Sequence, residues 1–245
     1  MCNLYAHMSN QEAHRHFIGH FEDRSGNLQQ YPGIYPDYTA PIIRNSPAGR
    51  ELVTTARWGL PTPDSVIEKA AHKRADKLRA KGKPVDFDQL LKVEPNSGTT
   101  NIRNTHYKDW QRFLGVEHRC VVPFTSFAEP QKIPGRDVGG PPVWFALDES
   151  RRLAFFAGAW TNWTGIRKIK EGMITTDLYA FLTTKPNPEV FEIHEKAMPV
   201  ILRTKEEIET WMTAPWQEAK DLQRPLPAGS LTIVARGTKT DGSPD

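Results

Sequence analysis

The residue with the clearest chemical potential is Cys2, which stands directly behind Met1. Removal of Met1 would leave an amine and a thiol on one residue, with pKa values of ~8 and ~8.5, so both would be partly nucleophilic at neutral pH. The amine can condense with an aldehyde to an imine, and the adjacent thiol can then close a five-membered ring. Position alone leaves this chemistry open, because a lone cysteine is more often a small buried apolar residue. Cys120, in an apolar stretch, fits that simpler interpretation.

Other polar residues that could act with Cys2 lie in short motifs along the chain. Asn101 begins an Asn-x-Arg motif, Glu129 ends a Phe-x-Glu motif, and His194 comes shortly before a Met-Pro pair. Each has an ordinary structural interpretation by itself. Asn101 could be a turn residue, Glu129 an exposed loop carboxylate, and His194 a hydrogen-bonding residue within a loop.

The motifs together, and in this order, resemble the SRAP family (SOS response-associated peptidase domain). They are Met-Cys, Asn-x-Arg (101–103), Arg-Cys-x-x-Pro (119–123) followed by Phe-x-Glu (127–129), Ala-Gly-x-Trp (157–160), and the late His before Met-Pro. The resemblance runs from Cys2 to about residue 202. It implies a protein that binds single-stranded DNA and traps abasic sites covalently through Cys2 as a thiazolidine, after Met1 is removed by autoproteolysis or by a housekeeping aminopeptidase.

The resemblance also assigns roles to individual residues. Cys2 is the nucleophile, and Asn101 orients the N-terminus and the sugar. Glu129 shuttles protons during imine formation and its reversal, whereas His194 is the acid that helps open the sugar ring. Histidine suits that role because its charge changes near neutral pH.

DNA contacts are implied at four further positions. Arg103 matches the phosphate-binding arginine of the family, and Arg44 is a further candidate for backbone contact. Pro41 and Trp58 match positions that line the family's DNA channel, although burial in the core explains Trp58 at least as well. A basic helix over residues 65–81 stands where some members carry paired tryptophans, and we interpret its cations as a solvated face in preference to a nucleic-acid contact.

Several departures from the family pattern stand out. Ala128 and Pro130 replace the Tyr and Trp that commonly flank the acid, and Thr105 replaces an acid after the Asn-x-Arg arginine. The His-to-Met-Pro segment is longer, with Lys196 and Ala197 ahead of Met198. These differences leave open whether the chain wedges a DNA strand as other members do.

The elements that must position these residues follow from local patterns. Capping boxes at Ser9 with Glu12, Ser65 with Glu68, and Thr204 with Glu207 predict three helices, over 9–21, over 65–81 and from 204 onward, and Pro215 could begin another. Residues 26–47 are rich in Pro, Gly, Asn and Tyr and predict loops around a short apolar piece at Ile42 and Ile43. Apolar runs predict strands at 51–60, 120–122, 143–147 paired with 153–157 as a hairpin, 178–184, 199–202 and 231–235.

These elements predict one α+β domain with a mostly antiparallel, twisted, barrel-like sheet and peripheral helices. We place the SRAP-like domain at residues 1–225, and a final strand with a flexible C-terminal tail at 226–245. No internal repeat or dividing linker occurs.

Composition sets the class of protein. The 245 residues include 38% hydrophobic and 25% charged residues with a net charge of +3, which permits nucleic-acid contact without requiring it. Two cysteines, no secretory signal and no long apolar run predict a cytoplasmic monomer that meets the nucleoid only when bound to DNA. We expect no membrane contact, no cofactor and no metal, since His16 and His20 lack a third ligand.

Two other functions compete with this interpretation. An N-terminal-nucleophile amidohydrolase, such as a glutamine amidotransferase, also exposes a cysteine behind Met1. Such enzymes typically continue with Gly, whereas Asn3 follows here. A non-catalytic binder of single strands would need only the basic helix and the tryptophans.

Overall fold

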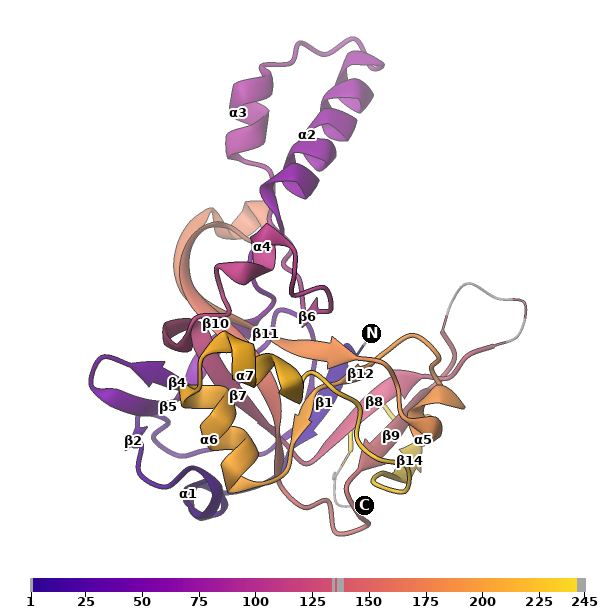
Figure 1. Cartoon of the computed structure of the whole chain (residues 1–245). Coiled ribbons are helices and arrows are strands. Elements are labelled where there is room, and N and C mark those ends of the chain that lie inside the picture. Colours follow the sequence, from indigo (N-terminus) through magenta and orange to yellow (C-terminus); the bar gives the residue numbers. More distant parts are fainter. Residues whose placement is uncertain (1, 134, 136–138, 242–245) are drawn as a thin grey trace.

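The structure is a computed structural model of the chain, and it describes residues 2–133, 135 and 139–241 (Figure 1). Its strands are Leu4–His7 (β1), Glu22–Asp23 (β2), Tyr31–Ile34 (β3), Thr39–Ser46 (β4), Gly49–Trp58 (β5), Asn101–Ile102 (β6), Arg119–Phe124 (β7), Ser126–Pro130 (β8), Pro142–Ala146 (β9), Ala154–Ile166 (β10), Met173–Thr184 (β11), Met198–Pro199 (β12), Ile201–Leu202 (β13) and Thr232–Arg236 (β14). Its α-helices are Gln11–Ile18 (α1), Asp64–Arg79 (α2), Phe87–Lys92 (α3), Lys108–Gln111 (α4), Pro188–Phe191 (α5), Lys205–Thr213 (α6) and Trp216–Ala219 (α7).

The strands form two sheets, one of which closes on itself. In the larger sheet the order β11-β10-β7-β4-β5 is antiparallel, and a parallel pairing of β5 with β11 completes the ring. The second sheet has the order β14-β9-β8-β1-β3. The fold is therefore a single α+β domain with a barrel-like core and peripheral helices, as predicted.

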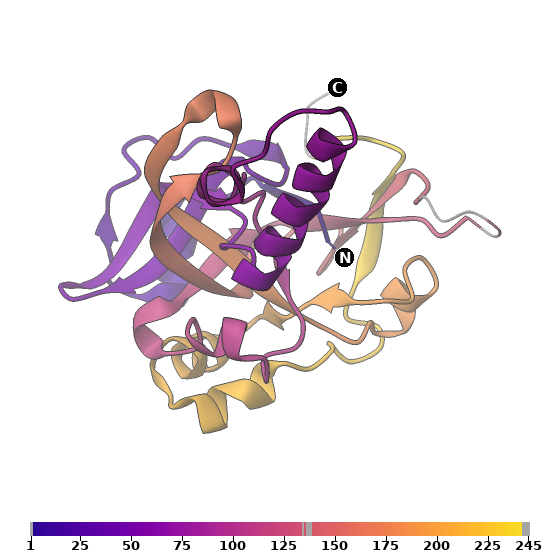
Figure 2. The ribbon, with the colours of Figure 1, turned by 90° about the horizontal axis from the view of Figure 1, so that it is seen from above.

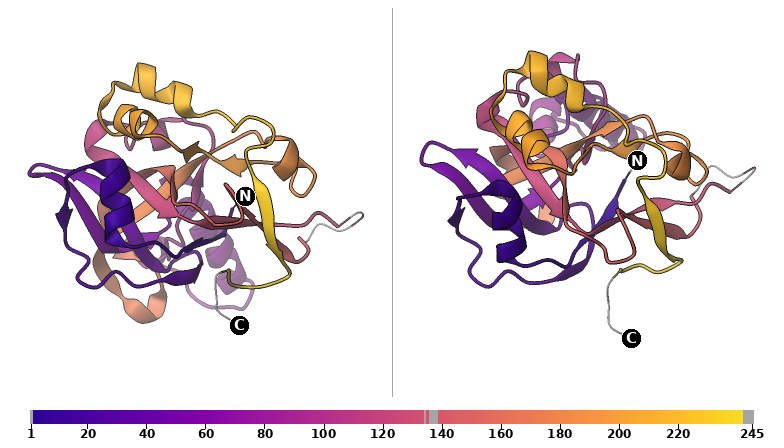
Figure 3. Two further views of the ribbon diagram at one scale, coloured as in Figure 1. Left: turned by 90° about the horizontal axis from the view of Figure 1, so that it is seen from below. Right: turned by 60° about the horizontal axis from the view of Figure 1, so that its bottom comes forward.

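The main core fills the barrel and the inner face of the second sheet. Tyr5, Trp58 and Phe181 meet there, with ring centroids 5.1 Å apart for Tyr5 and Trp58 and for Trp58 and Phe181. A second apolar cluster lies outside the barrel, where α1, α4 and α6 contribute Ile18, Trp110 and Trp211. The helices thus cover the outer wall of the barrel (Figure 3).

Two of the family motifs hold this barrel together. The Arg119 side chain is 1% exposed, and its guanidinium donates hydrogen bonds to the carbonyls of Leu114, Trp211 and Ala214. Gly158 lies so close to β7 that an added Cβ would stand 2.8 Å from the sulfur of Cys120. The Arg-Cys and Ala-Gly motifs therefore secure the packing of β7 against β10, and Cys120 is the buried apolar residue that its sequence context indicates.

Four local predictions were wrong. Asn10, rather than Ser9, caps α1, and α2 begins after Pro63 with no side-chain cap, whereas the Thr204–Glu207 capping box is confirmed. Residues 26–47 include β3 and β4 as well as loops. The segments expected to form a hairpin at 143–157 belong to different sheets, because β9 pairs with β8 and β14 while β10 pairs with β7 and β11.

At the C-terminal end, β14 pairs with β9, and Asp241 accepts hydrogen bonds from Ser126 and Arg151. The last four residues of the expected tail lie outside the described residues. Across the part of the chain that the structure describes, no helix has both the length and the apolar character needed to cross a bilayer.

Candidate active site

The backbone of Cys2 is held by the Asn-x-Arg segment. The Asn101 side-chain amide donates a hydrogen bond of 2.8 Å to the Cys2 carbonyl and one of 2.8 Å to the Thr100 hydroxyl. Thr100 donates in turn to the side chain of Asn3 over 3.0 Å. Asn101 occupies this place because β6 pairs with β11, next to the closure of the barrel. Residues 99 positions apart are thereby fixed against each other.

Glu129 and His194 meet beside this segment. Glu129 lies on β8, between β1 and β9, and its carboxylate is fully buried. His194 follows α5, where its backbone N–H donates to the Val190 carbonyl over 2.7 Å. Its Nε2 lies 3.8 Å from a Glu129 carboxylate oxygen. Two motifs that are far apart in the sequence therefore contribute an acid and an imidazole to one place.

Burial sets the protonation of this pair. Burial raises the pKa of Glu129 from 4.5 to about 8, and burial lowers the pKa of His194 from 6.5 to about 4. Glu129 and His194 would form an ion pair only if the imidazole were charged. Burial favours the neutral imidazole, so the two side chains face each other uncharged. At neutral pH the proton of the pair therefore rests on Glu129, which differs from the expectation that His194 changes charge near pH 7.

The thiol of Cys2 is closed off in this structure. The residue is 0% exposed, and its sulfur lies 3.5 Å from the Leu4 carbonyl as a hydrogen-bond donor. Burial raises the pKa of the thiol well above its ordinary value, and the negative charge of Glu129 raises it further. With Met1 still in place, the buried thiol is thus protonated at neutral pH.

Arg103 continues from this segment toward the surface. Its backbone carbonyl accepts a hydrogen bond from Gln223, which also binds the Thr183 carbonyl and so ties β6 to β11. Its half-buried guanidinium has no carboxylate partner within 4.0 Å among the residues that the structure describes. An uncompensated cation beside a reactive site is suited to an anionic group such as a phosphate.

The other three candidates for DNA contact serve the barrel in this structure. Arg44 pairs with Asp177 over 2.6 Å and with Glu51 over 3.4 Å, and its guanidinium lies 4.1 Å from the ring centroid of Trp160. Trp58 is 0% exposed and donates to the Thr100 carbonyl over 3.0 Å, so it supports the Asn101 segment from the core. Pro41 is buried at a register shift of β4.

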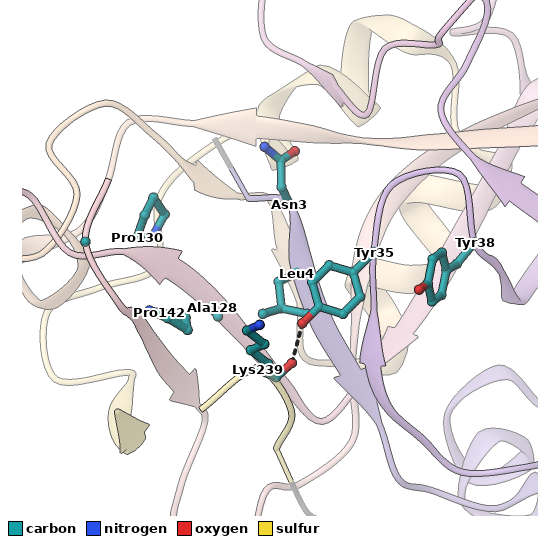
Figure 4. A pocket seen from close by; sticks show the side chains of 9 residues that line it. Asn3, Leu4, Tyr35, Tyr38, Ala128, Pro130, Pro142 and Lys239 are labelled. Atoms are coloured by element: carbon teal, nitrogen blue, oxygen red, sulfur yellow. Dashed lines mark hydrogen bonds between the residues drawn. The ribbon is translucent and has the colours of Figure 1, made fainter. Parts of the chain in front are cut away.

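A pocket of about 510 Å³ adjoins the site on the outer face of the second sheet (Figure 4). Asn3 lies at its edge, Leu4 and Ala128 form its floor, and Tyr35 and Tyr38 stand along its wall. Cys2, Glu129 and His194 are not among its lining residues. Glu129 follows Ala128 on β8 and therefore points to the opposite face of the sheet.

The sequence did not identify the residues that support the site. Thr100, Asn3 and Gln223 carry its hydrogen bonds, and only the position of Thr100 next to Asn101 gave any signal. Among the described residues, no group of three or more His, Cys, Asp or Glu side chains is placed to hold a metal ion.

Comparison with solved structures shows the same fold in proteins of two bacteria. A protein of Bordetella bronchiseptica is 21% identical, with a TM-score of 0.65 over 94% of this chain and 97% of its own. A protein of Bacteroides thetaiotaomicron is 18% identical, with a TM-score of 0.63 over 94% and 90% of the two chains. A phage-related protein of B. bronchiseptica is 18% identical, with a TM-score of 0.59 over 94% and 92%.

None of the curated proteins compared with the chain is a significant match. The family model described as SOS response associated peptidase matches residues 1–238, nearly the whole chain. The resemblance that the ordered motifs suggested is thereby confirmed, and it associates the protein with the response to DNA damage. The chain belongs to the SOS response associated peptidase (SRAP) family.

Proposed function

We propose that this protein binds single-stranded DNA and captures abasic sites covalently through Cys2 after Met1 has been removed. The observation that carries the proposal is the convergence near Cys2 of three motif residues from distant segments. Asn101 binds its carbonyl, the charge of Glu129 raises the pKa of its thiol, and His194 lies 3.8 Å from Glu129. An abasic deoxyribose in its open form is an aldehyde, the electrophile that an aminothiol captures.

The chemistry that these groups support proceeds in two stages. The Cys2 amine adds to the aldehyde carbon, and a proton passes from its nitrogen to the former carbonyl oxygen. The resulting hydroxyl leaves as water after it takes a second proton, which gives a protonated imine. Glu129, with its pKa of about 8, holds a proton at neutral pH that it can donate to this hydroxyl. The thiol sulfur then adds to the carbon of the protonated imine, and the C=N bonding electrons return to nitrogen. The thiol proton passes to the Glu129 carboxylate, which closes the thiazolidine and restores the acid. His194 stays neutral and can accept a proton as the sugar opens.

The deciding experiment mixes mature protein with an oligonucleotide that bears one abasic site and resolves the products on a denaturing gel. We expect a shifted covalent band that is absent in Cys2→Ala. No band, or a band that persists in Cys2→Ala, contradicts the proposal. Glutaminase activity that is lost in Cys2→Ala would instead favour the amidohydrolase.

The two arginines provide a matched pair for non-covalent DNA binding. Arg103→Gln is expected to weaken binding of an undamaged single strand about tenfold, since a charge-assisted phosphate contact is lost. It should also lower the salt slope, the steepness with which the logarithm of the binding constant falls with the logarithm of the salt concentration, by about 0.7. Arg44→Gln removes the same charge but leaves Asp177 and Glu51 without their buried cation. We therefore expect it to lower the melting temperature and leave the salt slope unchanged. Equal slopes for both variants would exclude Arg103 as a phosphate contact.

A further inference from the structure

Helices α2 and α3 form an arm that stands out from the barrel (Figure 1). Seen from above, α2 extends across the top of the molecule, and α3 lies at its side (Figure 2). Within the arm, Ala71 and Ala75 are buried, and the ring of the exposed His72 stacks on the half-buried Phe87 with centroids 4.2 Å apart. Such an arm buries little apolar surface and therefore adds little to the stability of the core. We ask instead what its exposed surface could bind.

The base of the arm is fixed to the candidate active site. Leu60 and Thr99 exchange backbone hydrogen bonds of 3.0 and 2.8 Å, and the side chain of Asn96 binds the N–H and the carbonyl of Thr62 over 2.9 and 3.2 Å. The buried guanidinium of Arg167 donates to the Gly59 carbonyl over 3.1 Å. Thr99 is followed directly by Thr100 and by Asn101, whose side chain binds the Cys2 carbonyl. The arm therefore keeps a set position relative to the site.

The outer face of α2 carries a row of like charges. Lys69, Lys73 and Lys77 are exposed and follow each other at intervals of four residues, on the side of the helix opposite Ala71 and Ala75. Within the described residues none of the three has a carboxylate partner. Two nearby acids pair with other cations: Glu94 with Arg74 over 3.1 Å and Asp76 with Arg79 over 3.0 Å.

Such a row differs from an ordinary solvated helix face. Exposed helices are stabilised when opposite charges alternate at this spacing, whereas like charges repel one another. An anionic partner would relieve that repulsion. Residues 69–83 contain seven Lys or Arg and one Asp, which extends the positive charge to the tip of the arm.

We propose that the outer face of α2 binds the sugar-phosphate backbone of the DNA strand that flanks the captured nucleotide. The inference deepens the proposed function, which places that strand at Cys2. With 16 residues, α2 is about 24 Å long, so it can follow several nucleotides beyond the site. The sequence interpretation of this helix as a solvated face took no account of its fixed position beside Asn101.

The test compares Lys73→Gln/Lys77→Gln with Lys205→Gln/Lys220→Gln, an equal change at exposed lysines that begin α6 and the turn after α7. Binding of undamaged single strands of about 25 and about 5 nucleotides is measured over a salt series. For the long strand, the salt slope of the arm variant should be about 1.4 smaller than that of the parent. The ratio of the parent's affinity to the variant's affinity should therefore fall about sevenfold as salt rises from about 50 to 200 mM. The short strand should bind both variants equally.

Circular dichroism checks that the arm variant keeps its helix content. We expect no loss, because glutamine is a good helix former and the substitutions remove like-charge repulsion. A slope that is unchanged in the arm variant, or lowered equally in the control variant, overturns the inference. So does a slope that falls equally for short and long strands. Because these strands contain no abasic site, the outcome is distinct from that of the covalent assay. If the arm variant lowers the salt slope but the parent forms no covalent band, only the proposal of covalent capture is refuted. If the parent forms the band but the arm variant leaves the salt slope unchanged, only the proposal that α2 binds DNA is refuted.

Discussion

Glu129→Gln is expected to make the protein more stable and slower to capture abasic DNA. The carboxyl is fully buried, and burial raises its pKa from 4.5 to about 8. A group whose pKa is higher in the folded state contributes stability that is complete below its unfolded pKa and is lost as pH rises through the folded pKa. Glu129 therefore destabilises the native state progressively between about pH 4.5 and pH 8.

The size of this effect follows from the shift. One pKa unit corresponds to about 1.4 kcal/mol, so the loss between pH 5 and pH 8 is about 3 kcal/mol. Glutamine has the same shape and does not titrate. The melting temperature of the variant should exceed that of the parent by roughly 5–10 °C more at pH 8 than at pH 5.

Thermal melts at several pH values between 5 and 8 measure this difference. The buried histidines His7 and His14, with pKa values lowered to about 3 and about 4, cause both proteins to lose stability as pH falls below about 6.5, and their effect cancels in the difference. Glu195→Gln is the matched control, because its half-exposed carboxylate lies beside His194 on the chain. A pH-independent difference for Glu129→Gln would contradict the raised pKa.

The same substitution should cost activity. Without a proton that it can donate and recover, the variant should form the covalent product about 100-fold more slowly, the usual scale of general acid catalysis. Non-covalent DNA binding should remain, since Arg103 is unchanged. A variant that is more stable and fully active would show that Glu129 takes no part in capture.

The sequence predicted those elements whose signals are local. The capping box of Thr204 and Glu207 acts within one helical turn, and α6 begins where it indicates. The hairpin expected over 143–157 failed because sheet membership depends on distant strands: β9 pairs with β14, which lies about 90 residues later. A turn signal between two apolar runs cannot report that the chain passes from one sheet to another there.

The candidate site shows the same division. Motif order indicated which residues to consider, and the structure brings Cys2, Asn101, Glu129 and His194 together. Their protonation could not be predicted, because it depends on burial by segments that are distant in the sequence. Trp58 illustrates the same limit: its motif position implied a DNA channel, whereas its full burial places it behind Thr100.

Asn101→Ala is expected to reduce capture far more than it reduces stability. The substitution removes the donor that fixes the Cys2 carbonyl over 2.8 Å, so the attacking groups lose their set position. A displacement of about 1 Å at a reacting group can lower a rate by about 100-fold, whereas the lost buried hydrogen bond should cost about 1–3 kcal/mol of stability. Single-turnover capture and thermal melts at one pH measure the two effects.

Thr100→Val gives the graded comparison. It leaves the bond from Asn101 to Cys2 intact but removes the hydroxyl that joins Asn101 to Asn3. Its effect on the capture rate should therefore lie between those of the parent and Asn101→Ala. DNA binding should be unchanged in both variants, because neither removes a cation. If Asn101→Ala and Thr100→Val lowered stability and capture in the same proportion, Asn101 would support the fold without positioning Cys2. A capture rate that falls only with Asn101, at similar stability, would show that the hydrogen bond to Cys2 itself orients the nucleophile.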